Sequence, residues 1–239
     1  MNLARCAATL RQMGTSLKQS RLVLVLALAA LAAGCATSKV AERRAGATIT
    51  AEPQPVSDTW RGIATPTDQG RINRVGLAWH QSLDEARSRH RRDITAEGEL
   101  LTPRAALGQP APTPGSYNCR MIRIGKTDRR SPVFEKFKPF FCYVQIDDEG
   151  RLTITKQTGS QRPAGRLWQD DDPTRMIFLG SLALGDEQEP VAYGDDLKRN
   201  MVGVFERIAP FRWRLVIPWP QNGAKIEVFE LSPVADQPE

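Results

Sequence analysis

The chain has 239 residues, with 33 basic and 27 acidic side chains and a formal net charge of +6. Residues 1–34 hold four of the basic residues and no acidic one, so the remaining 205 residues carry 29 basic and 27 acidic side chains. This near balance weighs against nucleic-acid binding, because such proteins concentrate unbalanced lysine and arginine on one face. A chain of this length suffices for one sizeable domain, or for a domain with a helical appendage.

The first 34 residues have the pattern of a secretion signal. A basic stretch precedes an apolar run at residues 22–33, which is too short to cross the roughly 30 Å hydrocarbon core of a membrane as a helix. The sequence LAAGC at residues 31–35 resembles the lipobox of bacterial lipoprotein precursors. The resemblance implies that residues 1–34 are a lipoprotein signal peptide and that the Cys35 thiol carries lipid. The alternative is an ordinary signal peptide in which Cys35 is incidental, and Met13 is an alternative start.

The residues after Cys35 predict where the protein resides. Ala36, in place of an aspartate, resembles lipoproteins that are sorted to the outer membrane of Gram-negative cells. The expected partner is therefore the membrane, through an N-terminal lipid anchor, with the protein facing the periplasm. Residues 35–57 have no apolar period and predict a flexible tether between this anchor and the folded part.

Residues 58–108 are predicted to form a helical segment. Thr65 is a suitable N-cap, Pro66 suits the first helical position, and Asp68 places an acidic group in the first turn. Apolar residues then recur at steps of three and four, which predicts one buried stripe along the helix. They are Ile72, Val75, Trp79, Leu83 and Ala86.

From residue 109 onward the apolar period changes to two, which predicts antiparallel strands. The candidate strands are 117–124, 140–147, 151–157, 165–169, 175–182, 190–193, 202–208, 211–218 and 225–231. Short strands joined by tight turns favour a closed or curled sheet, because closure removes exposed edges. The prediction is an α+β fold in which an amphipathic N-terminal helix packs on an antiparallel, barrel-like sheet of eight or nine strands at 109–239. Residues 115–117 are weakly similar to the start of calycin barrels.

The cysteines agree with export. Cys6 leaves with the leader and Cys35 takes the lipid, which leaves Cys119 and Cys142 in the folded part. A disulfide between them is the expected use of two cysteines in an oxidising compartment. Two buried free thiols are the alternative.

Few residues point to catalysis. His80 and His90 lie about 15 Å apart along one predicted helix, too far to share a metal, and no cofactor or metal is expected. The most informative polar stretch is residues 158–163, in which Ser160, Gln161 and Arg162 are candidate ligand-binding residues. Asp171 and Asp195 are further candidates for ligand binding. In the alternative interpretation, Arg162 pairs with Asp171 or Asp195 and joins two loops.

Several short sequence motifs between Trp60 and about Pro233 together resemble those of one family, the bacterial domain of unknown function 4893. They include residues 60–68, 158–165, 193–196 and 212–220. The resemblance implies one folded unit in bacterial envelope proteins and brings no activity with it. The leading functional hypothesis is a non-enzymatic binding module for an envelope protein or a small ligand. The alternative is a hydrolase that uses carboxylates such as Asp171 and Asp195.

Overall fold

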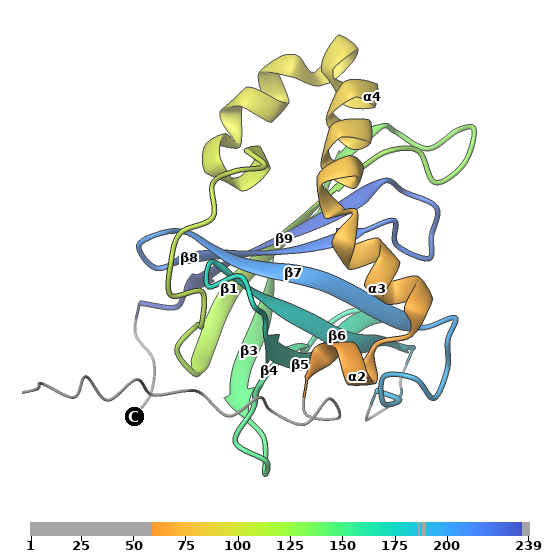
Figure 1. Cartoon of the computed structure of the whole chain (residues 1–239). Coiled ribbons are helices and arrows are strands. Elements are labelled where there is room, and N and C mark those ends of the chain that lie inside the picture. Colours follow the sequence, from red (N-terminus) through yellow and green to blue (C-terminus); the bar gives the residue numbers. More distant parts are fainter. Residues whose placement is uncertain (1–58, 186, 188–189, 236–239) are drawn as a thin grey trace, which may run out of the picture. The chain divides into compact units, whose positions relative to one another are not determined.

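The computed structural model describes residues 59–185, 187 and 190–235, which form an α+β unit built on an antiparallel barrel (Figure 1). The fold class predicted from the sequence is confirmed at this level. The predicted signal peptide, Cys35 and the tether lie outside the described residues.

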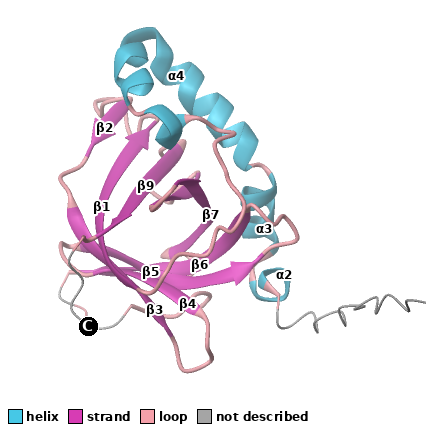
Figure 2. Cartoon of the chain, turned by 90° about the vertical axis from the view of Figure 1, so that its left-hand side faces the viewer, coloured by secondary structure: helices cyan, strands magenta, loops and turns pink. Residues whose placement is uncertain are grey.

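Nine strands form one antiparallel sheet in which almost every strand pairs with its neighbour in sequence. They are β1 (Gly115–Ile124), β2 (Phe134–Lys136), β3 (Phe140–Ile146), β4 (Leu152–Lys156), β5 (Gln161–Gln169), β6 (Arg175–Leu184), β7 (Asn200–Ala209), β8 (Arg212–Pro218) and β9 (Ile226–Pro233). The pairing order is β2-β1-β3-β4-β5-β6-β7-β8-β9, and β1 also pairs with β9 over eight residues. This last pairing closes eight strands into a barrel, seen in Figure 2, and leaves β2 as a short addition to β1.

Three details of the strand prediction are wrong. Residues 190–193 do not form a strand, because Pro190 has no N–H for a ladder and the Val191 carbonyl oxygen instead accepts a hydrogen bond from Ser181. The short strand β2 was missed, since its three residues are too few for a visible alternation. In addition, β5 begins at Gln161 rather than at residue 165, so part of the polar stretch lies in the sheet.

In the part of the chain that the structure describes, four helical elements precede the barrel: α2 (Trp60–Ile63), α3 (Pro66–Asn73), α4 (Val75–Ala96) and the 3₁₀ helix η2 (Gly98–Leu101). The predicted start is confirmed, because the Thr65 side chain accepts a hydrogen bond from the Asp68 N–H at 3.2 Å. The predicted single helix is interrupted at Arg74, whose backbone leaves the helical region.

Buried side chains gather in three clusters, one inside the barrel and two on its outer face. The inner cluster includes Phe178, Phe205 and Trp213. One outer cluster joins Trp79 and Leu83 of α4 with strand residues of β1, β8 and β9. The other joins Trp60 and Ile72 with strand residues of β5, β6 and β7. Several strands bury residues on both faces, inside the barrel and against the helices. These strands are therefore apolar over most of their length.

The predicted disulfide is confirmed and crosslinks two paired strands. Cys119 in β1 and Cys142 in β3 are bonded, and both side chains belong to the cluster inside the barrel. The bridge therefore holds β1 and β3 together from inside the barrel.

Reduction of this bridge should lower stability without unfolding the protein at room temperature. On the chain-entropy model, a bridge between cysteines 23 residues apart stabilises the folded protein by about 3 kcal/mol. Losing this free energy should lower the melting temperature of the reduced chain by roughly 6–12 °C. Thermal unfolding with and without reductant measures this, and a Cys119→Val/Cys142→Val variant is the control that should not respond to reductant. Equal melting temperatures for the oxidised and reduced native chain would contradict the prediction.

Candidate ligand-binding cavity at the mouth of the barrel

A cavity of about 450 Å³ opens at one end of the barrel. It lies at the end where β4, β6 and β8 finish and where β3, β5, β7 and β9 begin, and residues from all of these strands line it. Its apolar lining includes Met121, Phe140, Leu182, Met201, Ile217 and Phe229. A cavity of this size is typical of small-molecule sites, which are mostly apolar with a few polar groups.

Large side chains fill the barrel beyond this mouth, so the cavity is confined to one end. The Phe178 ring lies against Gly165 and Gly180, which are cross-strand partners and leave space for it by having no side chain. Phe205 is fully buried beside it in the same cluster. A further void of only about 20 Å³ separates the mouth from this filled region and shares Phe229 with the cavity. Apolar surface at the mouth therefore continues into the core.

The charges around the cavity are mainly positive. Within the described ranges, its lining includes one acidic residue, Glu227, and six basic residues, which are Arg71, Arg123, Lys138, Lys156, Lys198 and Arg199. Three of the six are paired with carboxylates: Arg123 with Glu227 at 2.9 Å, Arg71 with Asp68 at 2.9 Å, and Arg199 with Glu187 at 2.7 Å. Among the described residues, the three lysines have no carboxylate partner within 4 Å.

Lys156, at the end of β4, is the lysine that the barrel partly buries. Its Nζ donates a hydrogen bond to the Gln161 carbonyl oxygen at 3.0 Å and lies 4.4 Å from the centre of the Phe140 ring. Burial lowers the pKa of Lys156; Glu227 raises it, and Arg162 lowers it further. The ammonium group is therefore held in a site that does not fully compensate its charge.

A buried polar network fixes one wall of the mouth. Arg71 of α3 donates to the carbonyl oxygens of Pro218 at 3.0 Å and Trp219 at 2.6 Å, at the end of β8. Asp68 accepts hydrogen bonds from Arg71 at 2.9 Å and from the Tyr193 hydroxyl at 2.7 Å. Burial and this contact with Asp68 raise the pKa of Tyr193 to about 12, so the phenol stays protonated at physiological pH. The network joins α3, the β6–β7 loop and the end of β8.

The structure separates the three candidate residues of the polar stretch. Gln161 lines the cavity, whereas Ser160 lies in the exposed turn before it. Arg162 donates hydrogen bonds to the carbonyl oxygens of Gly159, Gly185 and Glu187. It thus joins the β4–β5 turn to the loop after β6, as the alternative interpretation expected, but through backbone carbonyls rather than through Asp171 or Asp195.

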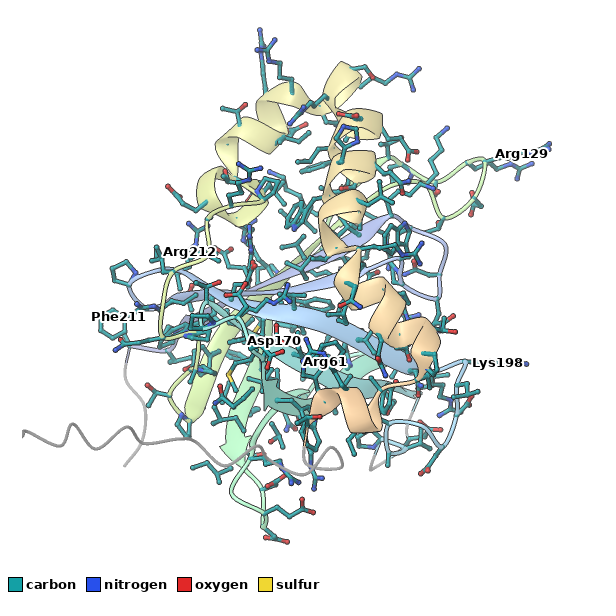
Figure 3. The ribbon with its side chains drawn as sticks, viewed as in Figure 1. Arg61, Arg129, Asp170, Lys198, Phe211 and Arg212 are labelled. Carbon is teal, nitrogen blue, oxygen red and sulfur yellow. A yellow bond between two sulfur atoms is a disulfide. The ribbon has the colours of Figure 1, made fainter. Side chains whose placement is uncertain are left out.

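The two candidate carboxylates lie apart. Asp171 belongs to the turn before β6 and pairs with Arg61 at 2.9 Å, while Asp195 belongs to the loop after that ten-residue strand. The buried acid of the turn before β6 is Asp170, which is next to Asp171 and accepts hydrogen bonds from Trp60 Nε1 at 2.8 Å and from Arg175 at 2.6 Å. Arg61 Nη2 lies 3.5 Å from Asp170 Oδ1, and both residues are labelled in Figure 3. Desolvation raises the Asp170 pKa, but the hydrogen bonds from Arg175 and Trp60 lower it more.

Lys156 and Glu227 line the cavity but were not predicted from the sequence as site residues. Lys156 follows Leu152 and Ile154 at steps of two, and Glu227 precedes Phe229 and Leu231 at the same steps. A charge that ends an apolar row of a strand faces the same side as that row. This alternation was the available signal for both residues.

Within the described part of the chain, no group of three or more His, Cys, Asp or Glu side chains is placed to hold a metal ion. None of the described helices has the length and apolar character needed to cross a membrane.

The fold and the cavity define a small antiparallel-barrel protein with helices before the barrel and a hollow mouth. The chain belongs to the family named domain of unknown function 4893 (DUF4893), whose model matches residues 60–231. No curated protein is significantly similar to the chain. One solved structure is similar, that of a protein with unknown function from the DUF3598 family of Nostoc punctiforme, at 14% identity and a TM-score of 0.32. The match covers 56% of this chain and 52% of that protein, so the chain spans about half of its length.

Proposed function

We propose that the protein is a non-enzymatic binding module whose barrel mouth takes up a small, largely apolar ligand. The observation that carries the proposal is the cavity of about 450 Å³ at the mouth, with apolar walls that continue into the core. Burying apolar ligand surface against such walls contributes about 25 cal/mol per Å², so a ligand of modest size has a sufficient driving force.

The geometry favours binding over the carboxylate-dependent hydrolase. A hydrolase that depends on carboxylates needs acidic side chains that converge on the substrate within one cleft. Asp171 and Asp195 lie on either side of β6, and Glu227 is the only carboxylate among the described residues that line the cavity. Glu227 already accepts hydrogen bonds from Arg123 and Asn222.

We place this module on the periplasmic side of the cell envelope, held by a lipid on Cys35. The support is the lipobox-like sequence at residues 31–35 and a disulfide in the folded part, which suits an oxidising compartment. An apolar ligand-binding site near a membrane has a ready supply of apolar ligands.

We also infer that the helical segment belongs to the same cooperative unit as the barrel, and that the barrel is calycin-like in its simple up-and-down order. Trp79 is 3% exposed within a cluster that includes Ile122 and Val228 of the barrel wall. A helical segment with this much shared buried surface should not unfold independently of the sheet.

Filling the cavity should abolish uptake of an apolar probe. Leu182 lines the cavity on β6, so Leu182→Trp should reduce binding of the neutral fluorophore N-phenyl-1-naphthylamine at least about tenfold by occupying its space. Leu184→Trp is the matched control, because Leu184 lies on the same strand, is exposed and does not line the cavity. Fluorescence titration measures both. Equal binding by the two variants would refute the barrel mouth as the site.

A further inference from the structure

Lys156 is placed to recognise one kind of ligand at the mouth of the barrel. We propose that the ligand is an amphipathic anion, whose carboxylate or phosphate binds Lys156 while its apolar chain lies against Phe229, Met201 and their neighbours. This inference rests on the proposed function and specifies the class of ligand.

The first support is the unused bonding capacity of the ammonium group. A lysine ammonium has three N–H donors, and Lys156 Nζ uses one of them, toward the Gln161 carbonyl oxygen. Among the described residues no carboxylate lies within 4 Å of it, its Nζ lies against the Phe140 ring, and the more distant Glu227 and Arg162 act on its charge in opposite directions. An anion at this position would accept the remaining hydrogen bonds, which are stronger than those between neutral groups.

The second support is the contrast with the other cations. The guanidinium groups of Arg71, Arg123 and Arg199 each contact a carboxylate, so an incoming anion would compete with an existing partner. Glu227, the acid that faces Lys156 from β9, is bonded to Arg123 and to Asn222. Lys156 is thus the partly buried cation whose charge the described protein groups leave available.

The third support is the entrance itself. Lys138 and Lys198 line the outer part of the cavity from the loops before β3 and β7, and both are exposed. Figure 3 shows Lys198 extending into solvent from its loop. Exposed charges of one sign around a cleft speed the arrival of ligands of the opposite sign, and salt screens this effect. The rim therefore steers an anion toward Lys156.

Probes with one chain and different head groups test the inference on the full chain. Octanoate, octyl phosphate, 1-octanol and octylammonium are each used to displace N-phenyl-1-naphthylamine. We expect octanoate or octyl phosphate to displace the fluorophore at a concentration at least about tenfold lower than 1-octanol, and octylammonium to be the weakest. The ratio of the two anions distinguishes a carboxylate from a phosphate ligand.

The same series on variants assigns the preference to one side chain. Lys156→Met should bring octanoate and octyl phosphate to within about twofold of 1-octanol and leave 1-octanol itself unchanged, whereas Lys156→Arg should keep the preference. Lys126→Met is the matched control, because Lys126 is exposed and does not line the cavity.

The outcomes separate the inference from the proposed function. Fluorophore binding with equal displacement by anions and 1-octanol in the native chain would overturn the anion inference and leave the binding module standing. An anion preference that persists in Lys156→Met would also overturn it. Absence of fluorophore binding would overturn the binding module, and calorimetric titration with octanoate would then decide whether an anion site exists. The comparison of probes on the native chain holds even if a variant does not fold.

Discussion

Replacing Arg214 by methionine is expected to lower the free energy of unfolding by about 3–5 kcal/mol, because it leaves a buried carboxylate without its partner. The Arg214 side chain is fully buried on β8, and its Nε donates to Glu206 at 2.6 Å. The Glu206 side chain is 13% exposed. Methionine keeps a similar apolar volume, so the loss reports the polar contacts rather than a cavity.

The remaining N–H donors of Arg214 hold the end of the helical segment. They bond to four backbone carbonyl oxygens, those of Glu99 at 3.1 Å, Leu100 at 3.1 Å, Thr102 at 2.8 Å and Pro103 at 3.1 Å. The guanidinium also lies 5.0 Å from the centre of the Trp79 ring. Since the carbonyls at a helix end have no partner within the helix, the arginine replaces water there. The variant therefore also tests whether the helices and the barrel unfold together.

The loss should depend on pH. Burial raises the pKa of Glu206 above its ordinary 4.5, although Arg214 opposes the shift. Without Arg214 the pKa rises further, so the folded variant keeps a proton that the unfolded chain releases above about pH 4.5. By linkage, the stability of the variant falls as pH rises through this window. The difference from the native chain should consequently be smaller near pH 4 than near pH 7.

Urea unfolding at both pH values measures these effects. Arg129→Met is the control, because Arg129 is exposed at the tip of the β1–β2 loop (Figure 3), and a shift below about 0.5 kcal/mol is expected for it. A shift below about 1 kcal/mol for Arg214→Met would show that these contacts contribute little. Unfolding of the helices before the barrel would contradict a single cooperative unit.

The Cys35→Ser substitution is expected to abolish metabolic labelling with a fatty acid and to convert a membrane-bound protein into an unprocessed or soluble one. Serine preserves size and polarity but lacks the sulfur that forms the thioether. A single acyl chain binds membranes weakly, at about 0.8 kcal/mol per buried CH₂, so the several chains of bacterial lipoproteins are what make the anchor permanent. The substitution removes all of them together.

Cys6→Ser is the matched control, because Cys6 lies within the predicted leader and its loss should leave labelling unchanged. Cell fractionation of both variants gives the second readout and should place the native chain in the outer membrane. Labelling and membrane association that persist in Cys35→Ser would refute the lipid anchor. The cavity and its ligand preference would remain testable on the purified chain.

Local sequence patterns determined those parts of the fold that depend on residues close together in the chain. Thr65, Pro66 and Asp68 define a helix start because capping involves only the first turn. Alternation marked the long strands because one side of each faces the inside of the barrel. The same local signals failed at β2, which is too short to alternate, and at residues 190–193, where Ser181 competes for a carbonyl oxygen.

Only the tertiary structure decided which charged groups are partnered and which are available. Arg214 and the carbonyl of Pro103 are far apart in sequence, as are Arg71 and the carbonyl of Pro218. Alternation shows that Lys156 and Glu227 face the barrel interior, but it carries no information on which of them meets a counter-ion. The counter-ions depend on how the eight strands close into a barrel. Closure brings β9 beside β1, so that Glu227 pairs with Arg123. Lys156 is left at the mouth without a carboxylate partner among the described residues.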